Sequence, residues 1–413
     1  MGGSALNSRG VETRRIEGIT EYSNIVLEVM GSVCESLLKT TQQDRIHACL
    51  STTHLPPKQM TAVKRVSQSF EHNGKSPSLN QVIFAPIPQY IQKESFGDVD
   101  FLILSQFDSK FWIELIEETF SPNAVVCNGG CISFDYKDFQ VDFILVKFNC
   151  DVNKDSTEDI TREILSKASE FDFSLRYYAW NDLGNFIGRT AHRCGFKFGH
   201  DGLWYVVRHP EDEDRVLGEV LVTDDFSKAL TVLGWSSRDV AQHDFLQTKN
   251  EIFEFACRSK FFDPRQFLLQ NRSYAARVRD AKRKMYSGML EYLAQKYPDC
   301  VGQSPLPFDR KGFVKETLEH FPEAKHKVEC LLKEAEFRTF IKPFCNGKFV
   351  VRIAEEGNIH VPVGKDLGVV MTKLKGFIHH NSELFGNQYH DPDALMLIAG
   401  SYVKLVLEET FGT

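Results

Sequence analysis

A block of strand-like segments between residues 82 and 148 constrains the fold of this sequence most. Residues 82–104 comprise an apolar run, a polar bridge and a second apolar run, which predicts strand, loop and strand. Residues 108–120 have the pattern of a helix that Asp108 or Ser109 could cap. Three further strand-like segments follow between turn residues: 124–128, 131–137 and 139–148. The block therefore predicts a small mixed β-sheet with helical cover.

Three aspartates occupy special places in this block. Asp98 and Asp100 open the second apolar run directly after Gly97, which lets the chain turn sharply before the strand. Alternate residues of a strand share a face, so these two carboxylates project side by side and repel unless a cation lies between them. Asp142 lies inside a later apolar strand, where an isolated carboxylate is costly to bury. If the two strands are neighbours, the three acids converge on a site for Mg²⁺, which prefers oxygen ligands.

A less specific interpretation applies to part of this pattern. A pair of aspartates two residues apart at the head of a strand is common, and alone it is more often a turn or a solvent-facing pair. The glycine before the pair, the apolar strand after it and the in-strand Asp142 favour the metal site.

Helical patterns dominate the rest of the chain. Residues 20–42 have apolar positions at helical spacing, and most of the chain after residue 155 is predicted to be helical, ending in a helix that begins at Pro392. Two segments differ, because residues 201–202 have the composition of a hairpin turn and residues 348–362 predict a hairpin or an extended stretch. Together with the sheet, this pattern predicts an α+β fold.

A polar, charged segment at residues 209–215 suggests the first domain boundary. We expect three domains: a sheet-containing domain of residues 1–210 that includes the N-terminal helix, a helical domain of residues 211–300, and a helical tail of residues 301–413. Residues 55–80 have the composition of an exposed loop or insertion.

Composition limits the classes of partner. No run of about 18 apolar residues and no apolar leader occurs, so we expect no membrane partner. Ten cysteines without zinc-ligand spacing indicate buried free thiols in a reducing, cytoplasmic compartment. The net charge of −7 argues against nucleic-acid binding over the whole surface, so any such binding needs a local basic patch.

The acidic motifs carry a family resemblance. A Gly-Asp-apolar-Asp strand, followed by the Val-Asp-Phe strand of Asp142, resembles the DNA polymerase β-type nucleotidyltransferase superfamily, which includes CCA-adding enzymes, poly(A) polymerases and antibiotic nucleotidyltransferases. The resemblance implies that residues 1–210 form a nucleotidyltransferase palm. It also implies two-metal transfer of a nucleoside monophosphate from an NTP such as ATP to a hydroxyl. Asp98, Asp100 and Asp142 would be the catalytic residues and the ligands of Mg²⁺ or Mn²⁺.

Longer stretches within about the first 290 residues are similar to uncharacterised nucleotidyltransferase-like proteins of phages and large viruses. They are residues 1–6, 12–22, 94–104, 181–205, 262–267 and 277–286. This subgroup implies no firm activity.

The sequence departs from the superfamily where the triphosphate should bind. Its members usually have a Gly-Gly or Gly-Ser pair about ten residues before the first aspartate, and here that region offers Lys93 and Ser95 instead. The only Gly-Gly-Ser lies at the N-terminus. Either the N-terminus folds back to supply a phosphate-binding nest, or Lys93 and Ser95 replace it. The candidate phosphate-binding residues are Gly2, Gly3, Ser4, Ser95 and Gly97.

A second candidate region for the nucleotide begins at residue 181. The resemblance places the base and ribose near four residues there: Asn181, Asp182, Asn185 and Arg189. Gly184 and Gly188 lie four residues apart on a predicted helix, so a flat base or another backbone could approach that face. Tight helix packing, with Asp182 as a helix cap, is the alternative.

A basic cluster suggests the acceptor. Its cations are Arg277, Arg279, Lys282 and Arg283, with Tyr274 and Tyr286 interleaved. Such a mixture suits a nucleic-acid strand, while a solvated helix face paired with Asp280 is the alternative. Residues 344–368 resemble a tail segment of CCA-adding enzymes, which implies an RNA substrate.

The sequence therefore predicts nucleotidyl transfer to the 3′ end of RNA or DNA. Two alternatives are transfer to a protein or small molecule on the same core, and a catalytically silent nucleic-acid-binding relative.

Overall fold

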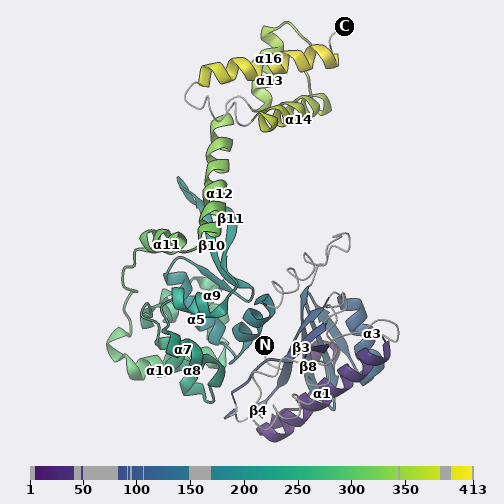
Figure 1. Ribbon diagram of the computed structural model, residues 1–413, viewed down its shortest axis with the longest axis vertical. Coiled ribbons are helices and arrows are strands. Elements are labelled where there is room, and N and C mark those ends of the chain that lie inside the picture. Colours follow the sequence, from purple (N-terminus) through teal and green to yellow (C-terminus); the bar gives the residue numbers. More distant parts are fainter. Residues whose placement is uncertain are drawn as a thin grey trace, which may run out of the picture. The chain divides into compact units, whose positions relative to one another are not determined.

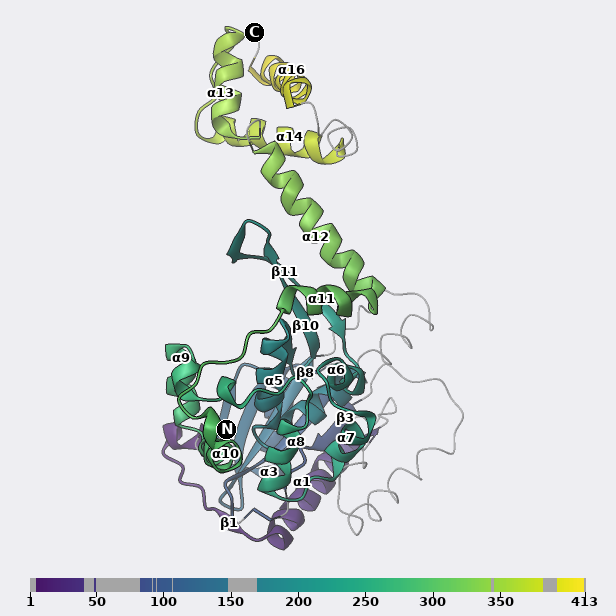
Figure 2. The same cartoon turned by 90° about the vertical axis from the view of Figure 1, so that its left-hand side faces the viewer.

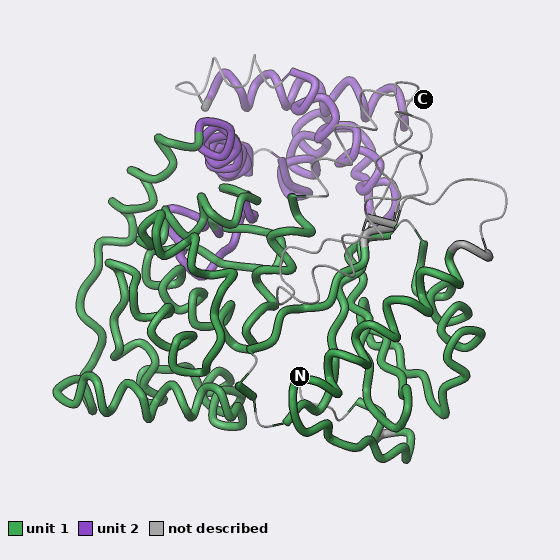
Figure 3. Tube along the Cα trace, turned by 60° about the horizontal axis from the view of Figure 1, so that its bottom comes forward, with its two compact units in different colours: residues 1–205, 221–321 green, residues 206–220, 322–413 purple. Residues whose placement is uncertain are grey.

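The computed structural model divides the chain into two compact units (Figure 3). The first comprises residues 1–205 and 221–321, and the second comprises residues 206–220 and 322–413. The structure describes residues 5–40, 48–49, 82–90, 92–93, 95–105, 107–147, 169–342, 345–381 and 392–411. The predicted loop at 55–80 lies outside these ranges.

A six-stranded mixed sheet organises the N-terminal part of the first unit (Figure 1). Its strand order is β2-β3-β5-β8-β7-β6, in which β2–β3 and β5–β8 are parallel and the other pairs antiparallel. The strands are β2 (Ala48–Cys49), β3 (Val82–Pro86), β5 (Asp98–Ser105), β6 (Val125–Asn128), β7 (Cys131–Tyr136) and β8 (Phe139–Lys147). The predicted mixed sheet and its α+β class are confirmed.

Two helices cover one face of this sheet. They are α1 (Ile19–Thr40) and α3 (Ser109–Phe120), both close to the predicted bounds, and both contribute to one apolar core with the strands (Figure 1 and Figure 2). Asp108 caps α3 by accepting a hydrogen bond from the backbone N–H of Phe111, as the sequence suggested. Ser121 ends that helix in the left-handed region, at φ 45°.

The opposite face of the sheet receives a helical segment at residues 169–178. Leu102 and Leu104 of β5 pack there with Phe171 and Leu175, whereas the intervening Phe101 belongs to the core of α1 and α3. Because side chains alternate along a strand, Asp98 and Asp100 share the face of Leu102 and Leu104. The acidic residues therefore project from the face that carries residues 169–178.

The remainder of the first unit is mainly helical. Its helices are α5 (Leu183–Arg193), α6 (Phe226–Val232), α7 (Ser237–Gln242), α8 (Lys249–Cys257), α9 (Tyr274–Ala281), α10 (Lys284–Lys296) and α11 (Arg310–Glu319). Residues 221–321 belong to the same unit as residues 1–205, so the chain does not divide at residues 210 and 300 as expected. A buried ion pair helps to explain this: Arg193 Nη1 lies 2.8 Å from Asp263 Oδ2, which also accepts from the backbone N–H of Leu306.

A second, three-stranded sheet has the order β11-β10-β9. Its strands are β9 (Lys197–Gly199), β10 (Gly202–His209) and β11 (Asp212–Thr223). The predicted turn at residues 201–202 does join β9 to β10. The charged segment 209–215 is not a linker, because it forms the turn between β10 and β11 and the start of β11.

The second unit contains four helices among its described residues: α12 (Pro322–Ile341), α13 (Gly347–Glu356), α14 (Lys365–His380) and α16 (Pro392–Phe411). Helices α13, α14 and α16 enclose an apolar core (Figure 1). The final helix begins at Pro392 as predicted. The predicted hairpin or extended stretch at 348–362 is wrong for residues 348–356, because Phe349, Val350 and Ala354 bury one side of helix α13 in that core.

Two expectations about the environment can be compared with the structure. Among the described helices, none has the length and apolar character needed to span a membrane. Eight cysteines have described side chains and are free thiols; among these eight only Cys194 is buried, and Cys127 and Cys330 are exposed. The prediction that the thiols are buried is therefore wrong for most of them.

Candidate active site

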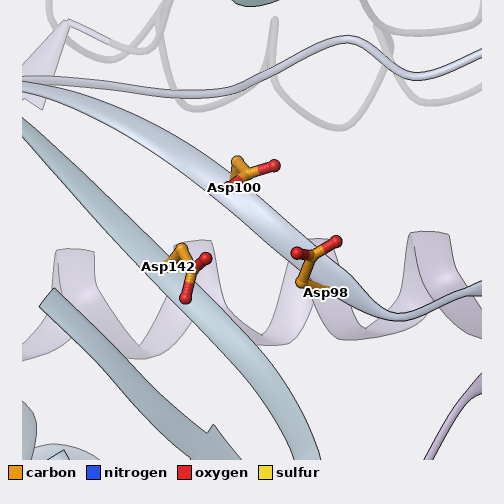
Figure 4. Close-up of side chains that lie close together, drawn as sticks. All are labelled: Asp98, Asp100 and Asp142. Carbon is orange, nitrogen blue, oxygen red and sulfur yellow. The ribbon is translucent and has the colours of Figure 1, made fainter. Parts of the chain in front are cut away.

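The pairing of β5 with β8 brings the three aspartates together. The two strands are parallel, with Asp100 directly opposite Asp142 and Asp98 opposite Gln140. One carboxylate oxygen from each aspartate can be chosen so that all three lie within 4.8 Å of one another (Figure 4). The two strands are thus the neighbours that the metal-site prediction required.

Burial and mutual repulsion raise the pKa values of two of these acids. Asp98 and Asp142 are buried and Asp100 is partly exposed. Burial, followed by the charges of Asp98 and Asp142, raises the pKa of Asp100 to about 8. Burial also raises the pKa of Asp142 to about 6, with a smaller contribution from Asp98 and against hydrogen bonds from Ser133 and Gln140. Ionisation of all three acids near neutral pH is therefore unfavourable unless a cation neutralises them. Three converging carboxylates are also the donor set that a hard divalent cation prefers.

Gln140 holds one of these acids in place, and the sequence analysis missed it. Its side-chain Nε2 donates to Asp142 Oδ1 and Oδ2 at 2.9 and 3.1 Å, while its Oε1 accepts the backbone N–H of Ala5 at 3.1 Å. A glutamine inside an apolar strand, two residues before Asp142 and on the same face, was the available signal.

The N-terminal segment reaches the acidic site through this contact. Ala5 begins the short 3₁₀ helix η1 (Ala5–Arg9), and its N–H bonds to Gln140, the neighbour of Asp98 across the ladder. The predicted phosphate-binding residues Gly2, Gly3 and Ser4 lie outside the described residues.

The loop before β5 places a cation beside the acids. Lys93 is half-buried; burial lowers its pKa, while the charges of Asp98 and Asp100 oppose that change. Its Nζ lies 5.1 Å from the centre of the Phe96 ring and 3.4 Å from Gln89 Oε1. The other two candidate residues of this loop are Ser95, in the short strand β4 (Ser95–Phe96), and Gly97, in the bend between β4 and β5.

Tyr22 of α1 is a further neighbour that the sequence did not reveal. Its ring stacks on Phe96 with centroids 4.1 Å apart, and its buried hydroxyl has no hydrogen-bond partner among the described residues. Burial, then the charges of Asp100 and Asp98, raise its pKa well above the usual value. The hydroxyl is therefore an uncharged polar group within electrostatic reach of the acids.

No protein-family model and no curated protein matches this sequence. The likeness to nucleotidyltransferases therefore remains a prediction carried by the motifs, and the chemistry of the site has to be argued from its geometry.

The candidate nucleotide residues begin in a strained turn. Trp180 and Asn181 both have φ 61°, which is costly for residues other than glycine. The backbone N–H of Trp180 donates to Pro88 O at 3.1 Å, and the adjacent Ile87 N–H donates to Asp100 O at 2.9 Å. The turn is thus attached to the strand that bears the acids, and the Asn181 Oδ1 is buried without a partner in the described part of the chain.

Asp182 does not cap the helix that follows it. Its carboxylate makes no hydrogen bond to the α5 backbone and instead accepts from Arg283 at 2.6 Å and from Asn185 at 3.1 Å. Gly184 supports the packing interpretation, because an added Cβ would lie 2.4 Å from the carbonyl oxygen of Tyr177, whereas a Cβ on Gly188 would meet nothing within 4 Å.

A buried carboxylate organises much of the basic cluster. Asp280 accepts from Arg189, Arg272 and Arg279 at 3.2, 3.2 and 3.4 Å. Arg189, expected near the nucleotide, therefore joins α5 to α9. The pairing of Arg279 with Asp280 matches the alternative given for this cluster.

Of the remaining residues of the basic cluster, some are exposed to solvent and others are buried. Arg277 and Lys282 are exposed, and Arg277 lies over the ring of the exposed Tyr274. Tyr286 is buried in the core, so it cannot stack on a base as the sequence suggested. Helix α9 also ends at Ala281, so the cations do not share one continuous helix.

The tail segment contributes a separate cavity within the second unit. Asn346 caps α13 by accepting from the backbone N–H of Phe349 at 3.0 Å. A cavity of about 900 Å³ lies beside this helix start, and its charged lining side chains are Lys342, Lys348, Arg352 and Glu355. The surplus of positive charge fits an anionic partner.

Proposed function

We propose that this protein is a divalent-metal-dependent nucleotidyltransferase. The observation that carries the proposal is the convergence of Asp98, Asp100 and Asp142 on adjacent parallel strands, with one carboxylate oxygen of each within 4.8 Å of the others. The raised pKa values of Asp100 and Asp142 give this cluster a reason to bind a cation rather than remain empty.

The reaction transfers a nucleoside monophosphate from an NTP to a hydroxyl. The acceptor oxygen forms a bond to the α-phosphorus, the bond from that phosphorus to the α–β bridging oxygen breaks, and its electron pair leaves with pyrophosphate. The hydroxyl proton passes to solvent. Bound Mg²⁺ or Mn²⁺ would supply positive charge to activate the hydroxyl and to neutralise the phosphate oxygens.

The chain's own residues provide the positions for this chemistry. The three aspartates would hold the metal ions, and Gln140 fixes the orientation of the Asp142 carboxylate through two hydrogen bonds. The turn that carries Asn181 and Asp182 would contact the nucleoside, since its backbone is bonded to Pro88 next to the Asp100 strand.

The acceptor that we propose is the 3′ end of RNA or DNA. Arg277 lies over the exposed ring of Tyr274, and Lys282 adds exposed charge at the end of α9, a mixture that suits a phosphate chain with stacked bases. The positively charged cavity beside α13 offers a second contact for phosphate.

The test is incubation of the purified protein with labelled NTPs and Mg²⁺ in the presence of tRNA, DNA or protein pools. Wild type should label a nucleic-acid pool, and both Asp98→Ala and Asp142→Ala should abolish the labelling. Equal results for wild type and both variants in every pool would contradict the enzymatic proposal. Label in the protein pool alone would retain nucleotidyl transfer but replace the acceptor.

A further inference from the structure

Two adjacent arginines near the N-terminus have different surroundings. The short strand β1 (Ile16–Glu17) pairs antiparallel with β4, with Ile16 opposite Phe96 and Glu17 opposite Ser95. Arg15 precedes this strand and its Nε donates to Ser95 Oγ at 3.1 Å. Arg15 is therefore anchored to the segment that leads into the acidic strand.

Arg14 is bonded to other parts of the protein, on α1 and in the turn between β7 and β8. Its Nη1 lies 2.7 Å from Glu21 Oε1, its Nε donates to Lys137 O at 3.1 Å, and its backbone N–H donates to Asp138 O at 2.7 Å. These bonds fix the N-terminal segment against the turn between β7 and β8, and they satisfy the Arg14 charge.

Lys93 lies beside the acidic site, and Arg15 is a second cation near Lys93. The charge of Arg15 lowers the pKa of Lys93, so the two cations lie within electrostatic reach of each other. In the described part of the chain, neither has a carboxylate within 4 Å, although Lys93 also feels the charges of Asp98 and Asp100. Two cations held together without an ion-pair partner favour binding of an anion.

The neighbouring aspartates limit which kinds of anion could bind there. A lone carboxylate or phosphate would be repelled by Asp98, Asp100 and Asp142, whereas a phosphate chain bound through a divalent cation is attracted to the acids and the cations together. The anion should therefore be a polyphosphate that brings its metal ion.

We propose that Arg15 and Lys93 bind the β- and γ-phosphates of the NTP, in the place where related enzymes use a glycine pair. The proposal rests on the proposed function and goes further by assigning the leaving pyrophosphate to two named side chains. Ser95 positions the Arg15 guanidinium through its hydroxyl. The pairing of β1 with β4 and the backbone hydrogen bond from Arg14 N–H to Asp138 O, both of which Arg14→Gln retains, hold the segment in place before the nucleotide arrives.

The experiment is calorimetric titration of the full-length protein with pyrophosphate in Mg²⁺, with orthophosphate as a second ligand. Arg15→Gln and Lys93→Gln should each weaken pyrophosphate binding by about tenfold or more, because each removes a charge-assisted contact. Arg14→Gln is the matched control and should bind within about twofold of wild type. Orthophosphate should bind far more weakly, since one phosphate cannot bridge the metal ions and both cations.

The possible results separate this proposal from the wider function. If wild type binds no pyrophosphate in Mg²⁺, the nucleotidyltransferase proposal itself is lost. If wild type binds and the Arg15→Gln and Lys93→Gln variants bind as the Arg14→Gln control does, only the assignment to these two cations is overturned. Arg15→Lys keeps the charge and should recover most of the affinity, which distinguishes charge from a folding defect; unfolding temperatures of all variants complete that check.

Discussion

The mutual repulsion of the three aspartates predicts that removing one charge stabilises the metal-free protein. Asp100→Asn keeps the shape of the side chain and removes its repulsion with Asp98 and Asp142. At 4.8 Å, the limit found for the three oxygens, two like charges repel by about 3.5 kcal/mol with an effective dielectric constant of about 20. Solvent at the partly exposed Asp100 reduces this value, so a gain of about 2–3 kcal/mol is expected when all three acids are ionised.

The stability gain from Asp100→Asn depends on pH. The pKa of Asp100 is raised in the folded state to about 8, so between the ordinary value near 4 and that value the folded protein holds a proton that the unfolded chain has released. The stability of metal-free wild type should therefore fall as pH rises through this window. At pH 5 only about the first pH unit of this window has been crossed, so the gain from Asp100→Asn should be much smaller than at pH 8.5.

Thermal unfolding in EDTA and in Mg²⁺ at pH 5 and pH 8.5 measures this effect. In EDTA at pH 8.5, Asp100→Asn should unfold roughly 3–8 °C above wild type. Added Mg²⁺ should stabilise wild type strongly at pH 8.5 and weakly at pH 5, and should stabilise the variant less. Asp138→Asn, at an exposed turn with φ 60°, is a control that should leave both effects unchanged.

Two results would refute this reasoning. One is an Asp100→Asn protein that is no more stable than wild type in EDTA at pH 8.5. The other is equal stabilisation of wild type and variant by Mg²⁺. Either would mean that the three carboxylates do not share one charge-coupled site.

Three further predictions concern packing and the acceptor surface. Gly184→Ala should cost about 2–3 kcal/mol of unfolding free energy in denaturant titrations, because its Cβ would lie 2.4 Å from a backbone oxygen, whereas Gly188→Ala should be neutral or stabilising. Asp280→Ala should lower stability by about 3–5 kcal/mol, since it leaves three arginines without their buried partner; a loss below 1 kcal/mol would contradict that role. Replacing Arg277 and Lys282 by Ala should weaken single-strand binding in anisotropy titrations and reduce the slope of log affinity against log salt by roughly 1.4, and an unchanged slope would remove both from the acceptor surface.

The sheet and the shared face of Asp98 and Asp100 were predictable because the relevant signals are local. Strand-length apolar runs and the alternation of side chains place Asp98 and Asp100 on one face, whatever the rest of the chain does. The step that sequence could state only conditionally was the pairing of β5 with β8, because more than thirty residues separate these strands. In the parallel register that they adopt, Asp142 lies opposite Asp100.

The errors arose where distant residues decide the structure. Residues 348–362 are rich in β-branched and aromatic side chains, which favours an extended stretch, yet the core formed with α14 and α16 stabilises helix α13. Arg189 was expected near the nucleotide, but its partner Asp280 lies ninety-one residues later in the chain. No local pattern identifies such a partner.

The absence of a glycine pair before Asp98 weakens the family resemblance, and the proposal above assigns the phosphates to Arg15 and Lys93 instead. Strand β4 comprises only Ser95 and Phe96, and β1 lies directly beside it. Antiparallel pairing at this position brings Arg15 to Ser95 and next to the charge of Lys93, while Gln140 attaches Ala5 to the acidic strands. An N-terminal segment can therefore take over the role of a loop when it is bonded at both ends of the site. In that arrangement metal binding depends on the sheet alone, whereas phosphate binding depends on the contacts of residues 5–17, so truncation of this segment should abolish pyrophosphate binding before it abolishes the stabilisation by Mg²⁺.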